Sequence, residues 1–328
     1  MSNSVYNCLK YTSKYFDEWN NFVSKSKNAT FLFYRDFIEY HNDRFHDFSL
    51  LVFKDEVLIA IFPANKDKEN VYSHQGLTYG GLILSDEIAF KDVLLVYKEL
   101  LKFLHNKAIS QLHIKLLPKI YNTLPSDEMN YLLFKTKAKL TRRDITSVID
   151  AKYKLSIQSS NRKRGLKKAK SHNLEIREIN NFEDFWNEIL IPNLKKRHLT
   201  NPVHSLEEIT FLKSKFLKQI RQFNVFSDGE VVAGATIFDT KHVAHVQYIS
   251  ANDDKQKLGS LDVLFHHLIN DVFKTKKYFD FGISNINQGK QINEGLLSWK
   301  ESFGARTIVH EFYKVDTKNY VELNSVFI

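Results

Sequence analysis

A lysine and a carboxylate stand close to a predicted strand end in residues 278–304. The run Tyr278–Gly282 is apolar apart from Asp280, and polar residues including Ser284 follow it, which predicts a strand that opens into a loop. Apolar residues then recur at helical spacing over 296–303, so Lys300 is expected on a short helix beside that strand end. Many α/β proteins bind substrates where a strand end meets a polar loop and a basic residue. The alternative is a solvated lysine beside a surface turn.

A histidine and three glycines make residues 73–81, SHQGLTYGG, the second unusual stretch of a chain that has only 11 glycines. Glycine lets a ligand approach the backbone closely. An imidazole with its ordinary pKa of ~6.5 suits a general base, which makes His74 a candidate for that role. A glycine-rich connection between two strands, with an exposed histidine, explains the pattern equally well.

Cations gather in two predicted helices. The run RKRGLKKAK, residues 162–170, winds round all sides of one helix, and most runs of this kind are simply solvated. Arg197 and His198 close the helix that follows Pro192. A guanidinium offers a planar fork to phosphate oxygens, so this second group is the better candidate for a diphosphate.

The predicted elements repeat their order along the chain. Two helices, a hairpin, a strand, a helix and a strand are expected once in each half, although no residue-level repeat relates the halves. The elements with the clearest signals are helices near 31–40, 86–106 and 261–273, hairpins at 49–62 and 223–238, and strands near 77–84, 111–117, 132–137, 145–149 and 242–249. Ser205 and Glu208 form a capping-box pattern before another helix. We expect a mixed α/β fold with two domains, residues 1–150 and 151–313.

Composition limits the classes of protein that the chain can belong to. Its 328 residues, 43% of them hydrophobic, can fill two cores, and a formal charge of +9 favours anionic partners. One cysteine, Cys8, excludes internal disulfides and thiolate metal cages. No long apolar run or signal-peptide centre occurs, so a cytoplasmic protein is expected. Thirteen histidines give no metal-site spacing, and no phosphate-loop, nucleophile-elbow or HExxH motif is present.

The C-terminal stretch resembles the signature of the FemABX-like branch of the GNAT acyltransferase superfamily. The resemblance rests on Tyr278-Phe279-Asp280-Phe281-Gly282, Gly295-Leu296, Trp299-Lys300 and Phe303-Gly304. It implies two tandem GNAT-like domains, each a mostly antiparallel sheet flanked by helices, with residues 314–328 returning to the first domain. It also implies that Lys300 lies at the transfer site. Residues 73–81 resemble a sequence motif of the sugar acyltransferases in this group.

The same resemblance implies how a donor would bind. GNAT enzymes wrap the pyrophosphate of coenzyme A in backbone N–H groups at a helix N-terminus. Gln256 and Gly259 match the first two fixed positions of that loop, whereas Leu261 departs from the third, and a plain turn capped by Ser260 explains the stretch nearly as well. We therefore expect Gln256, Gly259 and Ser260 to bind the donor.

The residues alone indicate a basic two-domain α/β protein with a candidate ligand cleft. The resemblance implies an acyl-CoA-dependent N-acyltransferase that acylates a nucleotide-linked amino sugar for a bacterial surface glycan, without metal or nucleic acid. The catalytic candidates are His74 and Lys300. The candidates for substrate binding are Gln75, Tyr79, Arg162, Arg197, His198, Tyr248, Asp280 and Ser284.

Two other functions stay open at this point. One is a FemABX-type transferase that uses aminoacyl-tRNA to extend a peptidoglycan precursor. The long coiled-coil insertion of some such proteins is absent here, and Leu117 stands before Pro118 where that branch tends to place an aspartate. The other is a basic module that binds nucleic acid, although interleaved acidic residues argue against one broad phosphate-binding face.

Overall fold

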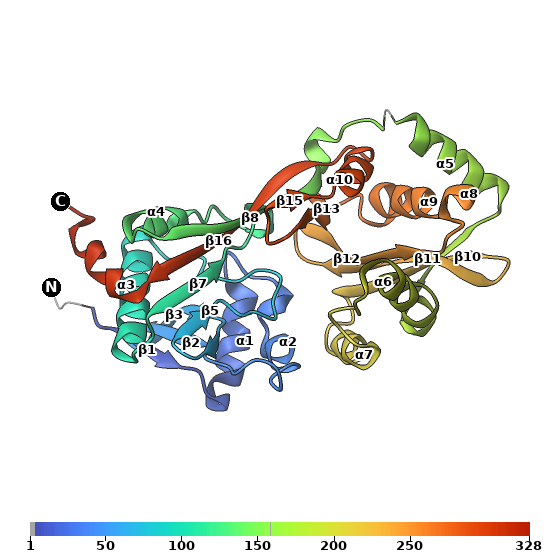
Figure 1. Cartoon of the computed structure of the whole chain (residues 1–328). Coiled ribbons are helices and arrows are strands. Elements are labelled where there is room, and N and C mark those ends of the chain that lie inside the picture. Colours follow the sequence, from blue (N-terminus) through green and yellow to red (C-terminus); the bar gives the residue numbers. More distant parts are fainter. Residues whose placement is uncertain (1–3, 158) are drawn as a thin grey trace. The chain divides into compact units, whose positions relative to one another are not determined.

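The computed structural model describes residues 4–157 and 159–328, apart from the side chain of His198. It divides into two compact units. Unit 1 comprises Met1–Asp144, Gln288–Lys290 and Val309–Ile328, and unit 2 comprises Ile145–Asn287 and Gln291–Ile308. Strands β8 (Lys139–Asp150) and β16 (Arg306–Asp316) each contribute residues to both units. The mixed α/β fold expected from the sequence is confirmed (Figure 1).

Unit 1 builds two strand groups around one hydrophobic core. An antiparallel sheet has the order β1-β2-β3-β6, and a second group has the order β4-β5-β7-β16. Its elements before β8 are β1 (Tyr6–Lys10), α1 (Phe16–Lys25), α2 (Arg35–Glu39), β2 (Leu50–Lys54), β3 (Val57–Phe62), β4 (Asn65–Asp67), β5 (Asn70–Tyr72), β6 (Ile83–Leu84), α3 (Phe90–Asn106), β7 (Gln111–Lys115) and α4 (Glu128–Lys135). The apolar face of α3 fills the core between these strands and α4. The predicted hairpin of β2 and β3 is confirmed.

Three predictions for unit 1 are wrong in detail. Residues 132–137 were expected as a strand but belong mainly to α4, where Met129, Leu132 and Leu133 are buried at helical spacing. The helix expected over 31–40 is interrupted because Tyr34 has an extended backbone. The strand expected over 77–84 is reduced to β6, because the stretch before it forms a loop pinned to β7.

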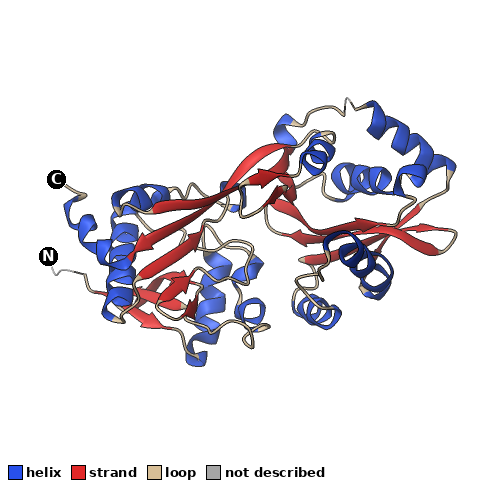
Figure 2. Cartoon of the chain, in the orientation of Figure 1, coloured by secondary structure: helices blue, strands red, loops and turns tan. Residues whose placement is uncertain are grey.

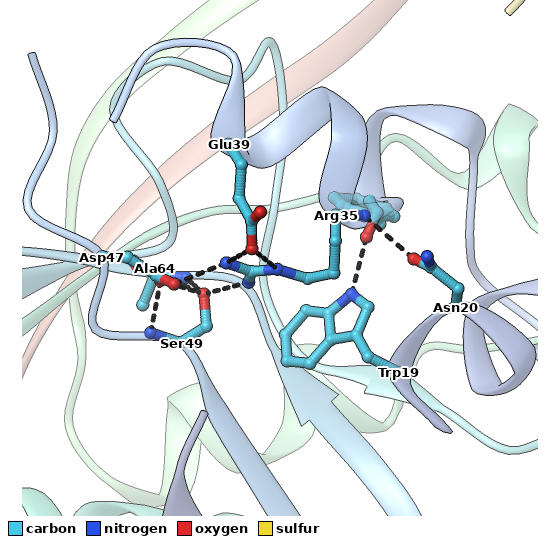
Figure 3. A network of polar contacts seen from close by, with 8 residues as sticks. Trp19, Asn20, Arg35, Glu39, Asp47, Ser49 and Ala64 are labelled. Carbon is cyan, nitrogen blue, oxygen red and sulfur yellow. Dashed lines mark hydrogen bonds and ion pairs between the residues drawn. The ribbon is translucent and has the colours of Figure 1, made fainter. Parts of the chain in front are cut away.

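A buried arginine ties several segments of unit 1 together (Figure 3). Arg35 is 1% exposed and lies between two carboxylates, donating to Glu39 at 2.8 Å and to Asp47 at 2.5 Å. Its guanidinium also donates to the hydroxyl of Ser49 and lies 3.7 Å from the ring centroid of Tyr11. A buried guanidinium needs such partners, because an unpaired buried charge is strongly destabilising.

Unit 2 is a six-strand sheet with helices on both faces (Figures 1 and 2). The order is β8-β13-β12-β11-β10-β9, antiparallel except where β12 meets β13. Helices α6 and α7 cover one face, and α5, α8, α9 and α10 cover the other. The elements are α5 (Ser160–Ser171), β9 (Glu175–Ile179), the π-helix η5 (Phe185–Leu190), α6 (Ile191–His198), α7 (Leu206–Lys215), β10 (Ile220–Ser227), β11 (Glu230–Asp239), β12 (Val243–Ala251), α8 (Lys255–Leu258), α9 (Ser260–His267), β13 (Tyr278–Ile283), β14 (Asn285–Ile286), β15 (Gln291–Ile292) and α10 (Glu294–Glu301).

Local signals in the sequence explain several of these elements. Ser205 and Glu208 make the predicted capping box at the start of α7. Asp228 and Gly229 both have positive φ, as the tight turn between β10 and β11 requires. Aromatic side chains of α9, β13 and α10 pack together in the core on the α9 face, with Phe265 in contact with Phe281 and Trp299.

Candidate active site

Two neighbouring strands of the unit 2 sheet, β12 and β13, separate from each other along their length. β12 and β13 pair as parallel strands over three residue pairs, from Val243–Tyr278 to His245–Asp280. Both strands continue beyond the last pair, β12 to Ala251 and β13 to Ile283. Within the part of the chain that the structure describes, the β13-facing edge of β12 therefore has no strand partner over its C-terminal part, and its backbone groups can bind an extended ligand.

A pocket of about 550 Å³ lies at the free end of β12. This size is typical of small-molecule sites. The end of β12 forms one part of its wall, η5 and α6 form a second part, and α5, α8, α9 and α10 form a third. The lining residues are Arg162, Leu190, Asn193, Leu194, Arg197, Ile249, Ser250, Ala251, Lys255, Gln256, Leu261, Asp262, Asn293, Gly295, Leu296 and Trp299. Leucine, isoleucine and tryptophan side chains supply the apolar part. Three cations and one carboxylate give the pocket a positive balance.

The charged groups of the pocket differ in their burial and in their ion-pair partners. Arg162 forms a largely buried ion pair with Asp262, and its Nε is buried without an acceptor among the described residues. Burial raises the pKa of Asp262 to about 6, although the charges of Arg162 and Lys168 oppose this rise. Arg197 is 40% exposed and donates to Asp253 at 3.3 Å. Burial and the Arg197 charge lower the pKa of Lys255.

Helix α5 covers the predicted phosphate loop. Gly259 has φ of +72°, and a Cβ there would overlap the carbonyl of Gly165 on α5. A Cβ at Gly165 would in turn overlap the carboxylate of Asp262, and Lys168 donates to the carbonyl of Gln256 at 3.0 Å. Gln256 reaches the pocket, whereas Gly259 and Ser260 are buried beneath α5. A diphosphate at the N-terminus of α9 would require α5 to move.

The side chain of Lys300 is hydrogen-bonded to the C-terminal end of β13. This side chain is 3% exposed and donates to the carbonyls of Gly282 at 2.8 Å and Ile283 at 2.7 Å. Burial lowers the pKa of Lys300 to about 8, against the opposing charge of Asp280. The buried hydroxyl of Ser284 follows directly and has no partner among the described residues. Two of the three ammonium hydrogens are thus engaged by backbone.

Asp280 is the centre of a buried polar network. Its carboxylate accepts hydrogen bonds from the hydroxyl of Thr146, the backbone N–H of Gly282 at 2.8 Å and Nδ1 of His245 at 2.9 Å. Burial alone would raise the pKa of Asp280, but the His245 charge and these hydrogen bonds hold that pKa below its usual range. Asp280 is therefore a carboxylate at neutral pH.

Tyr248 lies on β12 but does not line the pocket. Its hydroxyl bonds Nδ1 of His204 at 2.6 Å and accepts the backbone N–H of His204 at 3.1 Å. Burial raises the pKa of Tyr248 to about 12, and its ring packs edge-on against Trp186. These contacts anchor the segment before α7 to the sheet.

The stretch 73–81 belongs to unit 1 and forms a tightly bound loop. His74 is 0% exposed, stacks on His41 with ring centroids 4.9 Å apart, and neither of its ring nitrogens has a hydrogen-bond partner among the described residues. Burial, with the charges of His41, Lys115 and Arg35, lowers the pKa of His74 well below its ordinary value. Lys115 donates to the carbonyls of Gln75 and Leu77, and Tyr79 packs in the core. The exposed histidine of the alternative interpretation is not found.

Unit 2 thus collects most of the predicted site residues, in two groups. Arg162, Arg197 and Gln256 line the pocket, while Asp280, Ser284 and Lys300 lie around the end of β13. His74, Gln75 and Tyr79 belong to unit 1, and the side chain of His198 lies outside the described residues. Sequence reasoning missed Asn193, Lys255, Asp262 and His245, because their proximity arises from strand order and from the packing of α5 on α9. In the described ranges no three His, Cys, Asp or Glu side chains are placed to hold a metal, and no helix is long and apolar enough to span a membrane.

Part of the chain matches a known family of domains. Residues 195–291, which include β10 to β13 and the turn from β12 into α9, match the model of the acetyltransferase (GNAT) domain. No curated protein matches the chain in sequence.

Solved structures share the fold of most of the chain at low sequence identity. FemX is similar with a TM-score of 0.66 and 10% identity, over 97% of this chain and 99% of that one. A conserved protein of unknown function from Bacteroides thetaiotaomicron has a TM-score of 0.58 and 12% identity, over 95% of this chain and 99% of that one. The C-terminal domain of a putative lysylphosphatidylglycerol synthetase from Agrobacterium fabrum has a TM-score of 0.55 and 10% identity, over 81% of this chain and 84% of that one.

The matched residues contain the separated strands β12 and β13 and the pocket end of β12, so the family match and the site geometry fall on the same part of the chain. The predicted GNAT-like fold is confirmed, and residues 195–291 match a GNAT acetyltransferase domain, which supports the predicted N-acyltransferase class.

Proposed function

We propose that the protein transfers an acyl group from an anionic thioester donor to a primary amine, and that the unit 2 pocket holds the donor. The observation that carries this proposal is the position of the pocket at the free end of β12, with an apolar wall and a positive balance of charge. An activated acyl donor of this kind has a slender apolar arm attached to phosphate groups. The arm fits along the free edge of β12 and the phosphates fit at the cations.

Coenzyme A is the donor that the GNAT domain favours, and the residues present fit it in part. Arg197 and Lys255 lie at the pocket and can approach phosphate oxygens, and the buried Nε of Arg162 still has a hydrogen to donate. The backbone N–H groups at Gly259 and Ser260 do not fit this purpose while α5 covers them. We therefore assign phosphate recognition to side-chain cations and not to the loop backbone.

Direct transfer needs few groups. The amine must be neutral to attack the thioester carbonyl, and unpaired backbone N–H groups on β12 can stabilise the oxyanion of the tetrahedral intermediate. Lys300, with two hydrogens engaged by backbone carbonyls, holds the end of β13 in place and has one hydrogen left for such an oxyanion. His74 is fully buried in unit 1, so we do not assign it the role of the base.

For the acceptor we propose an amine on a phosphorylated small molecule. A nucleotide-linked amino sugar is the class that the resemblance of residues 73–81 suggests. This assignment depends on sequence resemblance alone, and the packing of that loop against β7 adds no contact specific to a sugar.

A second donor, aminoacyl-tRNA, is favoured by one specific observation. Helix α5 covers the α9 N-terminus and turns five cationic side chains to solvent, namely Lys163, Arg164, Lys167, Lys168 and Lys170. A polyanion can bind along such a face, with its acylated end in the pocket. The fold shared with FemX is compatible with this alternative.

Release of free thiol distinguishes the two donors. The purified chain is incubated with acetyl-CoA and longer acyl-CoAs in the presence of nucleotide-linked amino sugars, and thiol is followed together with amide formation. Thiol released in step with amide supports the first proposal. Amide formed only from aminoacyl-tRNA, with no turnover of any thioester, would transfer the assignment to the second donor.

A further inference from the structure

A histidine and a carboxylate meet where β12 and β13 separate. His245 and Asp280 form the last residue pair that joins the two strands, and Nδ1 of His245 lies 2.9 Å from a carboxylate oxygen of Asp280. A ligand that extends along the free edge of β12 ends at this pair, because the strands close beyond it.

The surroundings of Asp280 fix which nitrogen of His245 carries a proton. Asp280 is a buried carboxylate that already accepts from Thr146 and from the backbone N–H of Gly282, so it can only accept from His245. Nδ1 is then the donor, and in the neutral ring Nε2 carries the free lone pair. A histidine oriented in this way by a carboxylate can take a proton at Nε2 and be stabilised as the imidazolium.

Exposure separates His245 from the other histidines of unit 2 that have a polar partner. The His245 side chain is 13% exposed, so most of the ring is packed against the protein while part of it remains accessible to solvent. His204 is bonded to Tyr248 and is 4% exposed. His267 has a similar pair with Asp271 at 3.0 Å, but both lie exposed on the surface of α9 and its continuation. His245 alone among these three combines a buried carboxylate with an accessible ring.

We propose that His245 is the general base of the transfer reaction and that Asp280 is its positioning residue. This inference rests on the proposed function. Nε2 of His245 takes one proton from the ammonium form of the acceptor, and the freed nitrogen lone pair attacks the thioester carbonyl. As the intermediate collapses, the C–S bond breaks, the amide forms, and the nitrogen gives its second proton to the departing sulfur. The imidazolium then releases its proton to solvent.

The distance between the pocket and His245 specifies the shape of the donor. Ile249, the first pocket residue of β12, lies four positions after His245, which corresponds to roughly 13 Å along a strand. The phosphate-bearing part of the donor therefore binds at the α5, α6 and α8 cations, while a thin arm carries the acyl group toward His245. A compact acyl phosphate cannot span this distance.

The charged groups around His245 come from several elements. Asp280 on β13 contacts the imidazole directly, and Lys300 on α10 interacts with the same carboxylate. Thr146 on β8 is neutral, and Phe238, the β11 neighbour of His245, is apolar. The imidazolium formed during the reaction thus meets one carboxylate at contact distance, and removal of that carboxylate should affect protonation more than binding.

The test compares His245→Gln with His267→Gln, a matched change at the exposed histidine–aspartate pair. We expect H245Q to lower kcat by 10²-fold or more at unchanged donor KM, in the range of general-base catalysis, and H267Q to match wild type. Circular dichroism and thermal unfolding confirm that both variants fold. A kcat of H245Q within threefold of wild type, measured with a donor and acceptor that wild type turns over, overturns the inference and leaves the proposed function intact. Wild type that turns over no donor rejects the proposed function instead.

Two further variants separate a base from a structural residue. In His245→Ala, added imidazole should restore part of kcat, because a small base can enter the vacated space, and imidazole should leave wild-type kcat unchanged. Asp280→Asn should lower kcat and alter the pH dependence of kcat, because the amide no longer fixes the tautomer of His245. If H245A is inactive and unresponsive to imidazole although folded, or D280N keeps the wild-type pH profile, His245 is a packing residue and the inference fails.

Discussion

The ammonium of Lys300 lies 2.8 Å from the carbonyl oxygen of Gly282. This contact places a buried cation at the C-terminal end of β13. The lysine is thus an integral part of the strand end. Its pKa of about 8 lies below the ordinary value of 10.5, because burial disfavours the charged form.

The depressed pKa of Lys300 predicts a stability change with pH. Between pH ~8 and ~10.5 the unfolded chain binds about one more proton at this lysine than the folded chain, so stability rises with pH in that window. Below pH ~8 both states are protonated and the contribution is constant. Relative to Lys300→Met, wild type should gain on the order of 3 kcal/mol in free energy of unfolding from pH 7 to 10.5. Denaturant unfolding of both proteins measures this difference, and parallel pH curves would show that Lys300 is not desolvated.

Two buried histidines of unit 1 predict a stability change of the same sign, a rise with pH, in the acidic range. Burial lowers the pKa of His41 to about 4 and that of His74 well below its ordinary value. Their contribution to stability is complete above pH ~6.5 and is lost as pH falls toward ~4, with His41 alone accounting for roughly 3 kcal/mol. His41→Gln should lose less stability over this range than wild type, whereas exposed His105→Gln should follow wild type. Equal pH slopes for wild type and H41Q would contradict the prediction.

The contact between α5 and the loop before α9 predicts unequal costs at two glycines. Both Gly229 and Gly259 have positive φ, but a Cβ at Gly229 meets nothing within 4 Å, whereas at Gly259 it overlaps the Gly165 carbonyl. Gly229→Ala carries only backbone strain, of order 1 kcal/mol. Gly259→Ala adds a steric overlap worth about 1–3 kcal/mol more. Thermal unfolding of the two variants gives the comparison, and equal losses would mean that α5 does not rest on this loop.

The cations of the pocket predict a loss of donor affinity. Arg197→Gln removes a charged hydrogen-bond donor from the rim, which should raise the KM for acyl-CoA about tenfold. Lys163→Gln on the outer face of α5 is the matched control, because Lys163 is exposed and does not line the pocket. Comparable increases from the two variants would contradict recognition of the donor phosphates by the pocket cations.

The sequence allows the fold class and several elements to be predicted, because their signals are local. The capping box of Ser205 and Glu208 and the Asp228-Gly229 turn each act within a few residues. The sequence predicts a strand from Leu132, where the structure continues helix α4, since a short apolar run fits both periods until its packing is known.

The site was predictable only in part, for a related reason. Lys300 and Asp280 lie in one continuous stretch and could be selected together. The pairing of His245 with Asp280 depends on strand order, and the burial of Gly259 depends on where α5 packs. Neither relationship leaves a signal at fixed sequence spacing.

The central claim, that the unit 2 pocket holds the acyl donor, is tested most directly by filling that pocket. A Cβ at Gly295 meets only Asn293 Oδ1, at 3.7 Å, so Gly295→Phe can fold while its ring occupies the pocket. Ser298→Phe places the same ring at an exposed position of α10 outside the pocket. Titration calorimetry with coenzyme A should show binding to wild type and S298F, and at least tenfold weaker binding to G295F. Equal coenzyme A affinity for G295F and S298F, with both proteins folded, would contradict the claim.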